Sequence, residues 1–111
     1  MNNATALTET TDPYCLSDEA GAALLSGAPW RRFGVVGDSL SAGTSDPSPG
    51  YSGGPWCDRV VSTLRTVNPD LAYLNTAVIG QTTAQTLASQ VDRLVAFEPD
   101  LIHLPSGAND I

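Results

Sequence analysis

Three short apolar runs alternate with amphipathic segments along this chain. The runs span Arg32–Val36, Leu71–Asn75 and Leu101–Leu104, and they consist mainly of aliphatic and aromatic residues. Such runs are typical of strands that are covered on both faces in a parallel sheet. Amphipathic helices are predicted between them, at 55–68 and 82–98. Because strands alternate with helices over short connections, the pattern predicts an α/β domain with right-handed crossovers.

The predicted helices have start and stop signals. Ser17 can cap an opening helix that ends at Gly27. Pro55 suits the first position of the next helix, and Thr82 or Thr83 can cap the last. We expect one apolar face of each helix to be buried. Those faces comprise Ala20, Ala23 and Leu24 in the first helix, Trp56, Val60, Val61, Leu64 and Val67 in the second, and Leu87, Val91, Leu94 and Val95 in the third.

The segment 41–55 holds four of the ten glycines and three of the eight prolines, which predicts a long loop. Loops of this length in compact domains often bind ligands or act as lids. We expect residues 44–54 to decide which substrate is accepted. Tyr51 and Trp56 could line a ligand site beside this loop, but aromatic residues in such places more often pack, and packing is the expectation here.

Composition excludes several classes of function. The net charge is −7, and all five basic residues are arginines scattered along the chain. This distribution argues against binding to nucleic acid or to an anionic membrane surface. Because the chain has no lysine, Schiff-base chemistry and a Walker-type phosphate loop are excluded. No cofactor is expected, and the two cysteines and one histidine are too few for a metal site.

The polar start of the chain divides it into two parts. We expect 1–16 to be a flexible amino terminus and 17–111 to form the folded domain. The first residues lack the basic and apolar stretches of a signal peptide, and no segment is long and apolar enough to span a bilayer. A cytoplasmic location is therefore expected. Cys15 and Cys57 are expected to be small packing residues and not a disulfide framework.

Candidate chemistry follows each predicted strand. Gly37-Asp38-Ser39 comes after the first strand, Gly80 after the second and 107–110 after the third. The carboxyl ends of parallel strands meet at one edge of a sheet, so these loops should lie together. The arrangement suggests acyl transfer, in which Ser39 attacks a carbonyl. The amides of Ser39 and Gly80 and the side chain of Asn109 could then stabilise the oxyanion.

Each of these motifs also has a simpler explanation when it is taken alone. Gly-Asp-Ser is a common turn, in which Ser39 merely caps a bend. Gly80 alone indicates only that a loop changes direction. Asn109 could occupy a turn position with positive φ. The occurrence of all three motifs, each after its own strand and in this order, is much more specific.

Together the motifs resemble the GDSL esterase/lipase family, also called SGNH hydrolases. The resemblance rests on Gly37-Asp38-Ser39-Leu40-Ser41-Ala42-Gly43, on Asn75-Thr76-Ala77-Val78-Ile79-Gly80-Gln81-Thr82 and on Gly107-Ala108-Asn109-Asp110. It covers the chain from Arg32 to its end. In the second motif, Ile79 stands where many relatives have arginine.

The resemblance implies a flavodoxin-like three-layer α/β/α fold with a parallel sheet, of which three strands are present. It implies that Ser39 is the nucleophile and that Ser39, Gly80 and Asn109 form the oxyanion hole. The supporting residues are Gly37, Asp38, Gly107 and Asp110. The implied substrate is a carboxylic ester of a small molecule, a lipid or a sugar.

One family motif is missing. In the family, an Asp-x-x-His after the Asn motif supplies the general base, but nothing follows Ile111. Asp100 and His103 have this spacing, yet residues three apart on a strand point to opposite faces and lie about 10 Å apart. We therefore expect His103 to be a structural residue, with a minor possibility that it reaches the site. A truncated form with weak or no activity is expected.

Two other functions stay open. The chain could be a non-catalytic binding or regulatory remnant that retains the oxyanion pocket. Nucleotide binding on a Rossmann-like sheet is weaker, because the loop after the first strand lacks the G-x-G-x-x-G pattern. With no further strand beside it, strand 101–104 would be an apolar edge, which makes self-association plausible.

Overall fold

The computed structural model describes residues 6–43 and 46–111. Its centre is a three-stranded parallel sheet of β1 (Arg32–Val35), β2 (Ala72–Asn75) and β3 (Leu101–His103) in the order β2-β1-β3. All three predicted strands are confirmed to within one residue at either end. The central strand is the most apolar, and its last three residues are all buried.

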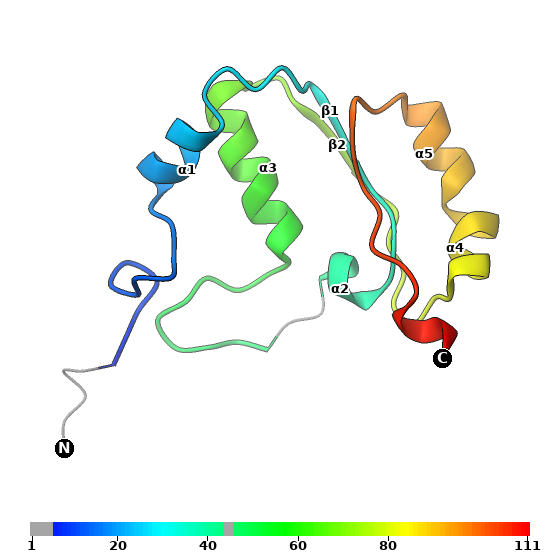
Figure 1. Cartoon of the computed structure of the whole chain (residues 1–111), viewed down its shortest axis with the longest axis horizontal. Helices are drawn as coiled ribbons and strands as arrows, with labels where there is room; N and C mark the ends of the chain where they lie inside the picture. The colour runs from blue at the N-terminus through cyan, green and yellow to red at the C-terminus, as the bar shows by residue number, and fades with distance from the viewer. Residues whose placement is uncertain (1–5, 44–45) are drawn as a thin grey trace.

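Helices cover both faces of this sheet (Figure 1). α1 (Asp18–Leu24) and α3 (Trp56–Val67) lie on one side, and α4 (Thr83–Ser89) and α5 (Val91–Phe97) lie on the other. The resulting three layers confirm the predicted α/β fold class. In the part of the chain that the structure describes, no helix is long and apolar enough to cross a membrane.

The main core lies between the sheet and α3. It consists of Phe33, Val35, Cys57, Val61, Leu64 and Leu71. Val61 and Leu64 were predicted from the helical stripe, and Cys57 is fully buried with a free thiol, as expected for a packing residue. Trp56 departs from the predicted stripe, because 41% of its surface is exposed at the first turn of the helix.

The opening helix is capped as predicted but does not bury the predicted face. The Ser17 side chain accepts a hydrogen bond from the Ala20 amide. Leu24, however, is 72% exposed, and Ala23 is exposed as well. The contact with α3 is made instead through Gly21, whose missing side chain lets the helix approach Thr63.

The third predicted helix is wrong as a single element. It is divided into α4 and α5 at Gln90, which serves as the C-cap of one and the N-cap of the other. Thr82 caps α4 as expected, in a capping box with Gln85. Leu87 and Val95 are about two-thirds exposed. The buried stripe is made of Thr86, Gln90 and Leu94, which recur every fourth residue.

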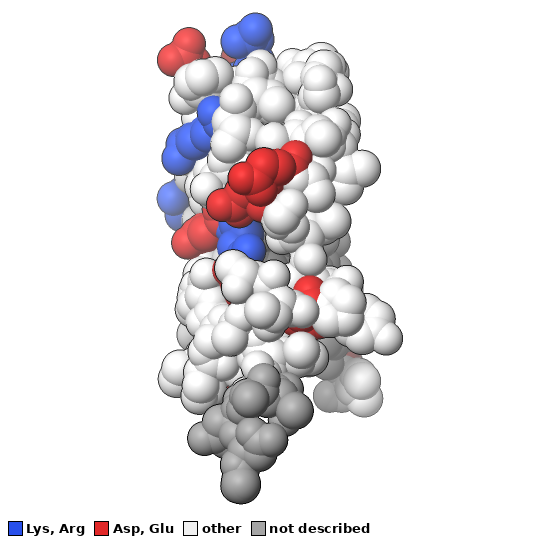
Figure 2. All heavy atoms as spheres, turned by 90° about the vertical axis from the view of Figure 1, so that its left-hand side faces the viewer, with Lys and Arg blue, Asp and Glu red and all other residues white. Residues whose placement is uncertain are grey.

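Residues 6–16 lie against α3 and the loop that precedes it, whereas residues 1–5 of the predicted amino terminus lie outside the described part. Glu9 forms an ion pair with Arg59 and accepts hydrogen bonds from the amide and hydroxyl of Ser52. Acidic and basic side chains are interspersed on the face of the molecule that carries α1 (Figure 2).

Candidate active site

The three predicted loops lie at one end of the sheet. α2 (Ser39–Ala42) follows β1, and the 3₁₀ turn η2 (Ala108–Asp110) follows β3 at the same end (Figure 1). The loop after β2 reaches the first loop through a hydrogen bond from the Val78 amide to the Gly37 carbonyl, 3.1 Å long. The parallel sheet therefore brings the three motifs together, as the sequence predicted.

Gly37 allows the first and third loops to touch. Its φ is +141°, in the region that disfavours side chains. A Cβ at this position would lie 2.5 Å from the carbonyl oxygen of Pro105, a backbone atom of the third loop. Only glycine fits here without moving one of the two loops, which accounts for its place before the proposed nucleophile.

Asp38 fixes the start of α2, in which Ser39 is the first residue. The Asp38 carboxylate is 2% exposed and accepts a hydrogen bond of 3.1 Å from the Leu40 amide. Ser39 is half-buried, and its hydroxyl has no hydrogen bond with another described residue. The predicted loop at 41–55 begins later than expected, because Ser41 and Ala42 belong to this short helix.

The second loop presents a free backbone donor. Gly80 is exposed with φ +82°, and its amide donates to no other described residue. Upstream, the Asn75 side chain accepts from the Ala77 amide and donates to the Ser41 carbonyl. The end of β2 is thereby tied to α2, which carries Ser39.

Asn109 connects all three loops. Its side-chain Nδ2 donates to the Gln81 carbonyl at 3.0 Å and approaches Asp38 Oδ2 at 3.5 Å. Gln81 follows Gly80, and Asp38 precedes Ser39. Asn109 therefore lies beside the chain neighbours of Ser39 and Gly80, the other two residues predicted to form an oxyanion hole.

Asp110, a supporting residue of the third loop, bonds to the first residue of α4. The Thr83 amide donates to Asp110 Oδ1 at 2.7 Å, and the Thr83 hydroxyl bonds to Ser106. The bonds from Thr83 lower the pKa of the Asp110 carboxyl below its ordinary value. Gly107 has φ +122° at the entrance of η2.

Sequence analysis missed Gln90, which is 1% exposed behind the first loop. Its amide oxygen accepts from the Gly37 amide at 2.9 Å, and its amide nitrogen donates to the Gly37 carbonyl at 2.8 Å. A polar residue at helical spacing from Thr86 and Leu94 was the available signal.

Asp100 does not orient His103. The Asp100 carboxylate accepts hydrogen bonds from the backbone amides of Arg31 and Arg32, which lower its pKa. The His103 ring packs edge-on against Trp56, with 4.5 Å between ring centroids. Trp56 in turn donates to the Leu40 carbonyl. The hydrogen bonds of Asp100 thus go to the backbone and not to the His103 ring, and the packing expected of Trp56 is observed.

Tyr51 joins the loop before α3 to the amino-terminal segment. Its hydroxyl donates to Asp12 Oδ2 at 2.7 Å. This bond to a carboxylate raises the pKa of Tyr51 to about 12, because ionisation of the phenol would break it. Thr44 and Ser45, in the loop predicted to select substrates, lie outside the described residues.

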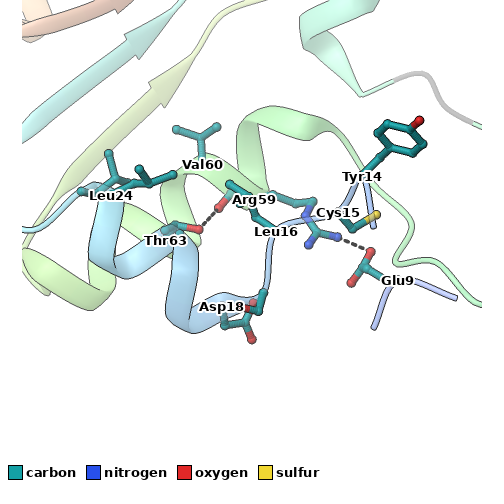
Figure 3. A pocket seen from close by; sticks show the side chains of 12 residues that line it. Glu9, Tyr14, Cys15, Leu16, Asp18, Leu24, Arg59, Val60 and Thr63 are labelled. Atoms are coloured by element: carbon teal, nitrogen blue, oxygen red, sulfur yellow. Dashed lines mark hydrogen bonds and ion pairs between the residues drawn. The ribbon is translucent and has the colours of Figure 1, made fainter. Parts of the chain in front are cut away.

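A pocket of about 610 Å³ lies away from these loops, between α1, α3 and the amino-terminal segment. Leu16, Leu24 and Val60 form apolar parts of its wall, with the Glu9–Arg59 ion pair at one side (Figure 3). None of its lining residues belongs to the three loops. Among the described residues, no cluster of three or more Asp, Glu, His or Cys side chains could hold a metal ion.

Comparison with known proteins gives one result. Searches of curated proteins and of solved structures returned no match. The family model described as the GDSL-like lipase/acylhydrolase family matches residues 35–111, which begin inside β1 and include all three loops. Since this match spans well over half of the 111 residues, the chain belongs to the GDSL-like lipase/acylhydrolase family.

Proposed function

We propose that this chain is a serine acylhydrolase that cleaves carboxylic esters at the edge of the sheet where the three loops meet. The observation that carries the proposal is the position of Asn109, whose side-chain nitrogen lies 3.0 Å from the Gln81 carbonyl and 3.5 Å from Asp38. One amide group thus contacts both a neighbour of Ser39 and a neighbour of Gly80. The family supports hydrolysis of acyl bonds in general.

In the proposed reaction, the Ser39 hydroxyl oxygen attacks the ester carbonyl and loses its proton. The carbonyl oxygen becomes an oxyanion that accepts hydrogen bonds from the Ser39 and Gly80 amides and from Asn109. Expulsion of the alcohol, which takes up a proton, leaves an acyl group on Ser39. Water then attacks this acyl-enzyme, releases the carboxylic acid and restores the serine.

The proton on Ser39 has no positioned acceptor among the described residues. His103, the only histidine in the printed sequence, packs on Trp56, and Asp100 is held by backbone amides. A positioned general base contributes about two to four powers of ten in rate. We therefore expect this chain alone to turn over esters slowly, with the proton passing to solvent.

The test is hydrolysis of p-nitrophenyl acetate by the purified chain. Ser39→Ala should abolish the enzyme-dependent release of p-nitrophenolate, because the attacking oxygen is removed. Ser26→Ala is the matched control, since Ser26 is exposed between α1 and β1 and should leave the rate unchanged. Equal rates for the parent chain and Ser39→Ala would contradict the proposal.

The Ser39 hydroxyl has no hydrogen-bond partner among the described residues, which favours a second candidate, a non-catalytic module that binds an acyl group or anion at the same donors. In that case the chain would bind acetate or a phosphonate saturably without turnover. Binding should be lost in Asn109→Ala and should survive in Ser39→Ala, which retains the backbone amide. Isothermal titration calorimetry distinguishes this outcome from catalysis.

A further inference from the structure

Gln90 lies directly behind the loop that carries Ser39. It is 1% exposed and uses its whole hydrogen-bonding capacity inside the protein. The oxygen accepts from the Gly37 amide at 2.9 Å and from the Thr76 hydroxyl at 3.1 Å. The nitrogen donates to the Gly37 carbonyl at 2.8 Å and to the Gln81 side chain at 2.6 Å. We call these four residues the Gln90 clamp.

The clamp requires an amide. Gly37 offers one donor and one acceptor to the same side chain, so the oxygen and nitrogen of Gln90 can face them in one orientation only. An apolar residue of the same length would leave both groups of Gly37 without this partner. A carboxylate would place negative charge against the Gly37 carbonyl, which is itself an acceptor. With an apolar residue, the Gly37 carbonyl would keep its bond from the Val78 amide, but the buried Gly37 amide would be unpaired, which is costly.

The clamp also joins two loops that the reaction needs. Gly37 lies two residues before Ser39, and Gln81 follows Gly80, yet Gln90 is 53 residues from Gly37 in sequence. The backbone of Gln90 is held by its own helices. The Gln90 backbone amide donates to the Thr86 carbonyl, and the Gln90 backbone carbonyl accepts from the Leu94 amide. The helix break therefore holds both loops against one rigid element.

We propose that Gln90 is a positioning residue for the Ser39 nucleophile and the Gly80 donor, an inference that rests on the function proposed above. Gln90 touches neither the substrate nor Ser39. It sets the backbone at Gly37 and the side chain of Gln81, and through them the separation between the attacking oxygen and the oxyanion donors. Transition-state binding depends on this separation more steeply than ground-state binding does.

The first test compares ester turnover by the parent chain, Gln90→Met and two controls. Gln90→Met preserves length and volume but removes every clamp bond, and it should lower kcat on the order of a hundredfold with KM nearly unchanged. Leu94→Ala and Thr86→Val alter the same buried helix stripe, and neither side chain makes a hydrogen bond to a described residue of either loop. Circular dichroism must show each variant folded, and both controls should retain the parent kcat.

The second test reads the clamp without activity. Hydrogen exchange followed by NMR should show the Gly37 amide protected in the parent chain and exchanging at least about tenfold faster in Gln90→Met. The Val36 amide, which bonds to the His103 carbonyl, should stay protected in both. Gln90→Glu adds a pH readout, because a protonated carboxyl can again donate to Gly37. The ester turnover of Gln90→Glu, relative to that of the parent chain, should therefore recover as pH falls.

The outcomes separate the two proposals. A folded Gln90→Met with parental kcat and a protected Gly37 amide would overturn the positioning role. If Leu94→Ala loses as much kcat as Gln90→Met while folded, the effect is general packing, and the role is again overturned. If the parent chain is inactive, the proposed function fails, and exchange at Gly37 alone decides whether Gln90 sets this loop.

Discussion

At the scale of single residues, backbone geometry fixes where Ser39 lies. Gly37 sits where β1 ends, and it combines a positive φ with a contact to the Pro105 backbone that a side chain would prevent. Asp38 then caps the short helix that begins with Ser39. The turn thus explains the glycine and the capping carboxylate, whereas the serine is accounted for only by the proposed reaction.

Gly37→Ala should be strongly destabilising. The new Cβ would lie 2.5 Å from a carbonyl oxygen at a φ of +141°, so strain and loop displacement should together cost about 2 kcal/mol or more. Gly53→Ala is the control, because a Cβ at that position meets nothing within 4 Å. It should change stability by less than about 0.5 kcal/mol in urea unfolding. Similar losses for the two variants would contradict this account of Gly37.

At the scale of elements, the strands could be predicted from sequence because burial on both faces selects apolar and β-branched residues. Because the sheet was predicted to be parallel, the three loops that hold Ser39, Gly80 and Asn109 were expected at the same edge. The break at Gln90 could not be predicted, since the hydrogen-bond partner of its side chain lies 53 residues away in sequence. The opening helix was predicted, but its buried face was not, because contact through Gly21 leaves no apolar signal.

Thr86→Val should stabilise α4. The Thr86 hydroxyl is buried without a hydrogen-bond partner among the described residues, and such a group costs about 1–3 kcal/mol. Valine has nearly the same volume and a similar helix propensity. We expect the midpoint of urea unfolding to rise, with no change in the far-ultraviolet circular dichroism. A lower midpoint would show that the hydroxyl has a partner in solution.

The amino-terminal segment should make stability sensitive to acid. The bonds from Arg59 and Ser52 lower the pKa of Glu9 from 4.5 to about 2. Since the folded pKa is depressed, this contribution is complete above about pH 4.5 and disappears as pH falls towards 2. Glu9→Gln should therefore be less stable than the parent near neutral pH.

The difference between these two proteins should shrink over that acidic range. Urea unfolding at a series of pH values checks this expectation. A difference that is independent of pH would show that Glu9 contributes through packing alone.

At the scale of the whole molecule, the sheet has two open edges in the described chain, because β2 and β3 each pair only with β1. The β3 edge carries Ile102 and Leu104, which are 51% and 57% exposed. Exposed apolar edge strands pair readily with other chains. A second copy of this chain is the partner that we expect.

Light scattering over a range of concentrations should show reversible association, weakened by Ile102→Lys. Leu24→Lys is the matched control, since Leu24 is an exposed apolar residue on α1, away from the sheet edge. It should leave the association unchanged. A monomer at every concentration, or equal effects of the two variants, would contradict self-association through this strand.

The contacts of Asn109 have a consequence for selectivity. The amide nitrogen of Asn109 already donates to the Gln81 carbonyl and lies 3.5 Å from Asp38 Oδ2. An incoming oxygen must therefore compete with an anion at the same donor. A neutral ester carbonyl is the weaker acceptor, whereas the negative oxygen of a tetrahedral intermediate can match the carboxylate. Asp38 would thus act as an internal competitor, so that the donor is given up mainly when charge develops.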